Sequence, residues 1–292
     1  MKVVGVDFSS APGSRKPITL ASGRLLPAES AAAVTAAPAA VACRVLRIDA
    51  HLRLPSLAAF ADWLAAPGSW VAGCDFPFGL PRPFLLAQGW DVLPNPAAAQ
   101  PSWADITARI AALSRLELVE RCRAWTAPRP VGAKFAHRAT DGPSGASPSM
   151  KWVNPPVVLM LQAGAPLLVA AGLTVPGLMA GDPGRIALEA YPGMLARQVV
   201  GRTSYKSDDR RKDDVTRRAA RDAITSALEA GRMGIAVEFA PGLRAPCIED
   251  ATADTLDAVL CAVQAAWGWL RRDENFGLPR DLDPLEGWTV GA

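Results

Sequence analysis

Residues 3–11, VVGVDFSSA, decide the fold class, because four residues suited to a buried strand run directly into an acid, Asp7. A lone Asp at the end of a strand is often a turn former or a helix cap, since its side chain accepts hydrogen bonds from nearby backbone N–H groups. Here the pattern recurs in residues 70–81, WVAGCDFPFGLP, and in 185–193, RIALEAYPG, which are also apolar runs that reach an acid close to Pro or Gly. Buried strands with helices between them predict an α/β domain built around a central sheet.

Hydrophobic periodicity and turn signals indicate the other elements. The remaining expected strands are 17–26 and 42–49, and the expected helices are 54–68, 211–230 and 251–270. The Ala- and Pro-containing stretch 27–40 fits either a loop or a short helix. Residues 157–173 are slightly short for a membrane span and contain Gln162 and Pro166, so we expect one or two buried helices there.

The middle of the chain has a different sequence pattern from its two ends. From 81 to 181, helical patches are broken by Pro and Gly, and a long polar loop spans 137–156. We therefore expect a helical insertion over 81–181, after the fourth strand, and an α/β domain formed by residues 1–80 and 182–292.

The composition is that of a globular protein. Half of the 292 residues are apolar, a fifth are charged, and the net charge of +3 is too small to imply a nucleic-acid partner by itself. The five cysteines are scattered without a C-x-x-C pair, and the two histidines lack the spacing of a zinc site. Free thiols, no disulfide partner and a cytoplasmic location follow. The apolar N-terminal stretch is too short for a secretory signal, and no membrane partner is expected.

Acidic side chains mark one edge of the predicted sheet. Ligands of open α/β sheets bind outside the carboxyl ends of the parallel strands, where Asp7, Asp75 and Glu189 would converge if their strands lie side by side. Asp254 and Asp257 lie three residues apart near the start of the last helix, so both can face the same way. Acids are also common at helix starts because they complement the helix dipole, and this reading suits Asp254 better than Asp257.

Such a group of acids predicts a site for divalent cations. Carboxylates packed together repel one another, so they either hold protons or bind cations. Oxygen ligands without His or Cys suit Mg²⁺ or Mn²⁺, and two such ions about 4 Å apart can activate water and stabilise a leaving oxygen in phosphodiester cleavage. The expected catalytic residues are Asp7, Asp75, Glu189, Asp254 and Asp257, of which all but Asp254 are expected metal ligands.

Basic and hydroxyl side chains supply candidate phosphate contacts. The segment 201–212, GRTSYKSDDRRK, follows the Glu189 strand and includes Arg202 and Lys206. Its neighbouring acids offset much of this charge, so a solvated surface loop is the alternative interpretation. Lys151 lies beside Trp152, a cation next to a possible stacking surface, and Ser9 follows the first strand. Ser9, Lys151, Arg202 and Lys206 are the expected phosphate-binding residues.

Six short motifs, taken together and in order, resemble a bacterial domain-of-unknown-function family of predicted nucleases with the RNase H-like fold. They are GVDFSSAPGSRKP (5–17), GCDFPFGLP (73–81), SPSMKWVNPP (147–156), LEAYPG (188–193), SYKSDD (204–209) and DTLDAVLCAVQAAW (254–267). The resemblance spans nearly the whole chain.

This resemblance implies a mixed five-stranded sheet flanked by helices, with Asp7 as the first-strand acid, Asp75 as the fourth-strand acid and Asp257 as the late-helix acid. Glu189 and Asp254 would be additional members. Better-known relatives of this fold have Glu more often than Asp on the fourth strand and lack the helical insertion. The activity implied is divalent-metal-dependent cleavage of nucleic acid, either RNA or DNA.

Two other functions fit the same residues. Actin-like ATPases and phosphotransferases share the fold and also begin with a strand, an Asp and small residues, so Ser9 and Ser10 could receive a phosphate. No Gly-x-Gly-x-x-Gly or Walker pattern supports nucleotide binding. A noncatalytic module that binds nucleic acid or protein through the insertion is the other alternative.

Overall fold

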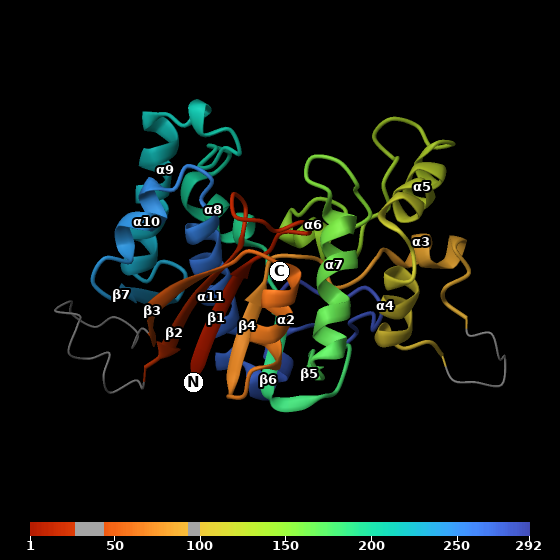
Figure 1. Cartoon of the computed structure of the whole chain (residues 1–292), viewed down its shortest axis with the longest axis horizontal. Helices are drawn as coiled ribbons and strands as arrows, with labels where there is room; N and C mark the ends of the chain where they lie inside the picture. Colours follow the sequence, from red (N-terminus) through yellow and green to blue (C-terminus); the bar gives the residue numbers. More distant parts are fainter. Residues whose placement is uncertain (27–43, 93–99) are drawn as a thin grey trace.

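A computed structural model describes residues 1–26, 44–92 and 100–292. Its centre is a mixed sheet with the strand order β5-β6-β4-β1-β2-β3-β7 (Figure 1). The strands are β1 (Lys2–Asp7), β2 (Ile18–Leu25), β3 (Arg44–Leu54), β4 (Trp70–Cys74), β5 (Leu173–Thr174), β6 (Asp182–Glu189) and β7 (Ile235–Phe239). The prediction of an α/β fold with a mixed sheet flanked by helices is confirmed. Seven strands form the described sheet rather than the expected five, because the short β5 and β7 extend its two edges.

Three central strands run in the same direction. β1 is parallel to β4, and β4 is parallel to β6, whereas β2 is antiparallel to both β1 and β3. The carboxyl ends of β1, β4 and β6 therefore lie at one edge of the sheet. In the register of these strands Val6 is opposite Cys74, and Cys74 is opposite Glu189.

Helices cover both faces of the sheet. They are α2 (Leu57–Ala65), α3 (Arg82–Ala87), α4 (Trp103–Ala111), α5 (Arg115–Thr126), α6 (Asp141–Ser144), α7 (Val157–Ala170), α8 (Pro192–Val200), α9 (Val215–Glu229), α10 (Arg244–Glu249) and α11 (Asp254–Leu270), with 3-10 helices η1 (Arg210–Lys212) and η2 (Arg272–Gly277). The helices predicted from periodicity correspond to α2, α9 and α11, and most of the apolar stretch at 157–173 forms the single helix α7, while Leu173 begins β5. The prediction of a loop or short helix at 27–40 lies outside the described residues.

Alternate residues of the strands enter two separate hydrophobic clusters, as the period of two in a strand requires. Val4 and Val6 pack with the helices α2, α4 and α7, on what we call the insertion face. Val3, Val71 and Leu188 pack with α8, α9 and α11, on what we call the α11 face. In Figure 1, α2 and α7 accordingly lie on one side of the sheet and α11 on the other.

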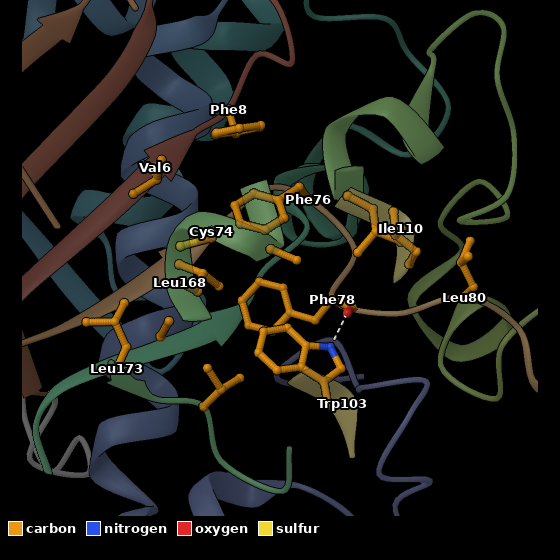
Figure 2. Close-up of a cluster of buried hydrophobic side chains, with 14 of the residues drawn as sticks. Val6, Phe8, Cys74, Phe76, Phe78, Leu80, Trp103, Ile110, Leu168 and Leu173 are labelled. Carbon is orange, nitrogen blue, oxygen red and sulfur yellow. Dashed lines mark hydrogen bonds between the residues drawn. The ribbon is translucent and has the colours of Figure 1, made fainter. Parts of the chain in front are cut away.

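The predicted insertion shares its core with the sheet. Phe76 and Phe78, which follow β4, pack in one cluster with Trp103 of α4 and Leu168 of α7 (Figure 2). The indole Nε1 of Trp103 donates a hydrogen bond of 2.5 Å to the carbonyl oxygen of Phe78. Helices from 81–181 thus cover the insertion face, while the domain boundaries themselves stay a prediction.

Two glycines allow α11 to lie directly against β1 and β4. A Cβ atom added at Gly5 would be 1.8 Å from the carbonyl oxygen of Ala258, and one added at Gly73 would be 2.3 Å from that of Cys261. Any larger residue would push the helix away from the sheet, because backbone atoms cannot rotate out of the way. This close contact brings the first turn of α11 to the carboxyl ends of β1 and β4.

Candidate active site

Two of the predicted acids lie side by side at the sheet edge. Asp7 is the last residue of β1, and Asp75 directly follows β4. The backbone N–H of Asp75 donates to the carbonyl oxygen of Val6 at 2.9 Å, so the strands stay paired up to the acids. Strand alternation places both residues on the α11 face, together with Gly5 and Gly73. Both side chains are half-buried.

The first turn of α11 adds Asp254 and Asp257. Asp254 is half-buried, whereas Asp257 is only 1% exposed. The Oδ1 atom of Asp257 accepts a hydrogen bond of 2.7 Å from the hydroxyl of Tyr205, and its Oδ2 atom accepts one of 2.5 Å from Nζ of Lys206. Both donors come from the segment that follows α8. Asp257 is thus a buried anchor for this segment.

Asp7, Asp75, Asp254 and Asp257 form one electrostatic group, which we call the acid cluster. Burial, and then repulsion from Asp257, Asp254 and Asp75, raises the pKa of Asp7 well above its usual range, although Lys206 opposes the change. Burial also raises the pKa of Asp75 to about 7, with Lys206 again opposing. The pKa of Asp254 is raised as well, chiefly by burial. Carboxyl groups whose pKa is raised by burial and by neighbouring acids are typical of sites that bind cations or move protons.

The acid cluster borders a cavity of about 860 Å³. Asp7, Asp75 and Asp254 line its acidic side, while Pro156 and Met160, at the start of α7, belong to its apolar wall. Cavities that bind small molecules commonly measure about 300–1,000 Å³. The space beside the acids is therefore large enough for a nucleotide-sized group.

Two lysines bring positive charge to this cavity. The side chain of Lys206 is 46% exposed and lines the cavity, while its Nζ pairs with Asp257. Burial alone would lower the pKa of Lys206, but the charges of Asp257, Tyr205, Asp75 and Asp7 raise it well above its usual value. Lys16 also lines the cavity and forms an ion pair of 2.8 Å with Asp208. Lys206 therefore stays a cation at neutral pH.

Glu189 lies at the same edge but is bound differently. It shares its register position with Cys74 and Val6, so its side chain belongs to the insertion face rather than the α11 face. Its Oε1 accepts from Nη2 of Arg138 at 2.7 Å and from the hydroxyl of Thr289 at 2.9 Å. Its Oε2 accepts from Nη1 of Arg138 and from the backbone N–H of Phe78, both at 2.8 Å.

The bonding of Glu189 argues against its predicted role as a metal ligand. Each carboxylate oxygen already accepts two hydrogen bonds, which is the usual capacity of such an oxygen. A metal ion would have to displace the buried guanidinium of Arg138, which is only 3% exposed. Glu189 is therefore fully hydrogen-bonded in this structure, and its predicted role as a metal ligand stays a prediction.

Sequence reasoning missed Arg138, Tyr205 and Lys16. Arg138 belongs to the long polar loop at 137–156, and its Nε also donates to Asp141 at 3.1 Å. Nothing in a polar loop marks one arginine as buried, because its partner Glu189 is distant in sequence. Tyr205 could have been predicted, since it directly precedes Lys206 and Tyr hydroxyls usually find a partner when buried.

Only one of the other three predicted phosphate-binding residues lines the cavity. Ser9 lines the cavity, and its Oγ accepts a hydrogen bond of 3.4 Å from the N–H of Ala11. Lys151 does not line it, although its Nζ donates a hydrogen bond of 2.7 Å to the carbonyl oxygen of Asn154, which does. Arg202 is exposed and also lies outside the cavity lining. Of the four predicted residues, the structure brings Ser9 and Lys206 to the acid cluster.

Several other features bear on the predictions about metal, membrane and disulfides. Within the described residues, no three His, Cys, Asp or Glu side chains already converge on one point as metal ligands would. Lys206 and Tyr205 instead hold both oxygens of Asp257. None of the helices in the described ranges has both the length and the apolar character needed to cross a membrane. Cys74, Cys122, Cys247 and Cys261 are free thiols, and Cys43 lies outside the described residues.

Comparison with known proteins found no match to the chain among protein-family models, curated proteins or solved structures. The resemblance to the RNase H-like family therefore rests on the six sequence motifs. The functional argument rests on the geometry of the acid cluster and its cavity.

Proposed function

We propose that the protein is a divalent-metal-dependent hydrolase that cleaves phosphodiester bonds of nucleic acid, on an RNase H-like framework. The arrangement of the acids supports the framework. The central strands β3-β2-β1-β4-β6 form a mixed sheet, with Asp7 on the first strand, Asp75 after the fourth and Asp257 on a late helix. This is the placement that the family resemblance implies.

The single observation that carries the proposal is the shared environment of Asp7 and Asp75. Both are half-buried at one cavity, and burial raises the pKa of each, in Asp75 to about 7. A protein keeps such groups together at a cost in stability, which is usual for functional sites. A dication would relieve the repulsion, so the donor set suits Mg²⁺ or Mn²⁺.

Each residue has a distinct role in this proposal. Asp7 and Asp75 would hold the metal, and Asp254 is a further carboxylate that lines the same cavity. The bound metal would supply an activated water and stabilise the leaving oxygen. Lys206 carries a positive charge at the cavity and would bind a phosphate oxygen, while Asp257 and Tyr205 fix its position. Glu189 acts through Arg138 by fixing the loop that contains Arg138.

Cleavage assays with labelled single-stranded and duplex RNA and DNA test this proposal. We expect cleavage in Mg²⁺ or Mn²⁺ but not in chelator, and a loss of at least about 100-fold for Asp7→Asn, because metal stabilisation of a transition state is worth several kcal/mol. Asp62→Asn, on the exposed surface of α2, is the matched control and should leave the rate unchanged. Circular dichroism checks that both variants fold. Metal-independent cleavage, or full activity of Asp7→Asn, would reject the mechanism.

The size of the cavity favours a second candidate, an actin-like phosphotransferase or ATPase. A volume of about 860 Å³ accommodates a single nucleotide, and Ser9 lies on its lining. A ligand that binds the native state raises its melting temperature. Stabilisation by Mg²⁺-ATP but not by oligonucleotides would select this function over nucleic-acid cleavage.

A further inference from the structure

The segment 101–134, which contains α4 and α5, carries an unbalanced positive charge. It has six Lys and Arg residues against three Asp and Glu residues, an excess equal to the net +3 of the whole chain. We call these cations the basic arm. They are Arg109, Arg115, Arg121, Arg123, Arg129 and Lys134. Figure 1 shows α4 and α5 together at one end of the molecule, beside α3.

No cation of the basic arm forms an ion pair with a carboxylate in the described ranges. Arginines elsewhere usually do, as in the pairs Arg221–Asp213 and Arg244–Glu229. The basic arm therefore differs from the other arginine-rich surfaces in pairing as well as in number.

Helix capping explains why two of the three acids in segment 101–134, Asp105 and Glu117, leave the arginines of the basic arm unpaired. Asp105 accepts hydrogen bonds from the N–H of Ser102 at 2.8 Å and from its hydroxyl at 2.6 Å. Glu117 accepts one of 2.7 Å from the N–H of Ser114. Both carboxylates thus reach back over the start of their helices, in capping boxes, and away from the arginine four residues later.

The basic arm also connects to the cavity. Arg115, at the start of α5, donates from Nη1 to the carbonyl oxygen of Ser10 at 3.0 Å. Ser10 lines the cavity that the acid cluster borders. Arg121, Arg123 and Lys134 are exposed and lie farther along the chain from this contact. The basic arm therefore has one cation in contact with a residue that lines the cavity, and three exposed cations on the same segment of chain.

We propose that the basic arm binds the phosphate backbone of a polynucleotide whose reacting phosphodiester lies at the acid cluster. This inference rests on the proposed function and adds to it the surface that binds the substrate, a polymer several nucleotides long rather than a mononucleotide. Arginine and lysine contacts to phosphates are independent of sequence, so the arm would strengthen binding without selecting bases.

Binding of labelled oligonucleotides in chelator, where no cleavage takes place, tests the arm separately from the chemistry. The probes are single strands and duplexes of about 24 nucleotides, and a single strand of about four. The test variant combines Arg121→Gln, Arg123→Gln and Lys134→Gln. The control combines Arg218→Gln, Arg244→Gln and Arg272→Gln, three arginines with side chains 59%, 41% and 43% exposed that have carboxylate partners. Both variants change the net charge by the same amount.

We expect the test variant to bind the long single strand at least about tenfold more weakly at 0.1 M salt, and to reduce the slope of log K against log salt by about 2, since each phosphate contact contributes roughly 0.7. The control and the short probe should change little. Equal losses in both variants, or no loss in the test variant, would overturn the inference. So would equally tight binding of polyglutamate, which would indicate an acidic protein partner. If binding responds as expected while Asp7→Asn still cleaves, the arm stands and the proposed mechanism fails.

Discussion

Two sets of carboxylates lie at one edge of the sheet, on opposite faces, and they differ in what surrounds them. On the α11 face, Asp7 and Asp75 are half-buried beside other acids, and burial raises the pKa of both. On the insertion face, Glu189 is 4% exposed and accepts four hydrogen bonds, two of them from Arg138. Both sets line the same cavity, but one is electrostatically strained and the other is neutralised.

The difference shows that the identity of a residue and its place at a strand end do not determine its role. Strand register decides which face the side chain enters, and the helices of that face decide what it meets. The α11 face supplies Asp254 and Asp257, whereas the insertion supplies Arg138. Repulsion can be relieved by a cation from solution, but Glu189 already has its cation.

Among substitutions that test this comparison, the largest expected effect is on the free energy of unfolding. Glu189→Gln leaves the buried guanidinium of Arg138 with fewer charge partners, and removing one partner of a buried ion pair costs about 3–5 kcal/mol. Asp7→Asn should not lower the free energy of unfolding, because it removes a repelled carboxylate. Urea unfolding at neutral pH without divalent cations measures both variants. Equal destabilisation of the two would contradict the distinction between the faces.

A smaller effect is expected in the pH dependence of stability. The pKa of Asp75 is raised from 3.8 to about 7 in the folded state. The native state therefore holds a proton that the unfolded state has lost, and stability falls as pH rises between these values, by at most about 1.4 kcal/mol per pH unit. Asp75→Asn removes this contribution.

The measurement for this second prediction is the difference in the free energy of unfolding between wild type and Asp75→Asn, from about pH 5 to about pH 8 in chelator. The wild type should lose stability relative to the variant as pH rises to about 7, and the difference should level off above that. A difference that is constant over this range would mean that Asp75 is already ionised at the lowest pH.

The sequence was sufficient for the fold class and for most of the acid cluster. Apolar runs ending at Asp7 and Asp75 indicated strands, and the spacing of Asp254 and Asp257 placed both on one side of a helix. These are local patterns, with periods that a single segment reveals. The close contact of α11 with Gly5 and Gly73 was not predicted, because a glycine in a strand does not indicate which helix packs against it.

The role of Glu189 required information that no local pattern contains. Its face depends on the register between β4 and β6, and its partner Arg138 is 51 residues earlier in the chain. The edge strand β5 was missed because two residues are too short to display a period, and the five residues of β7 carry no local sign of the distant strand β3 with which they pair. Pairings between distant segments limited the prediction in each case.

The most direct test of the central claim is a crystal of the protein soaked in Mn²⁺, examined by anomalous scattering. We predict a peak at coordination distance from Asp7 and Asp75, on the α11 face, that is absent in Asp7→Asn crystals treated in the same way. No peak beside these two residues, or a peak that replaces Arg138 at Glu189, would contradict the account.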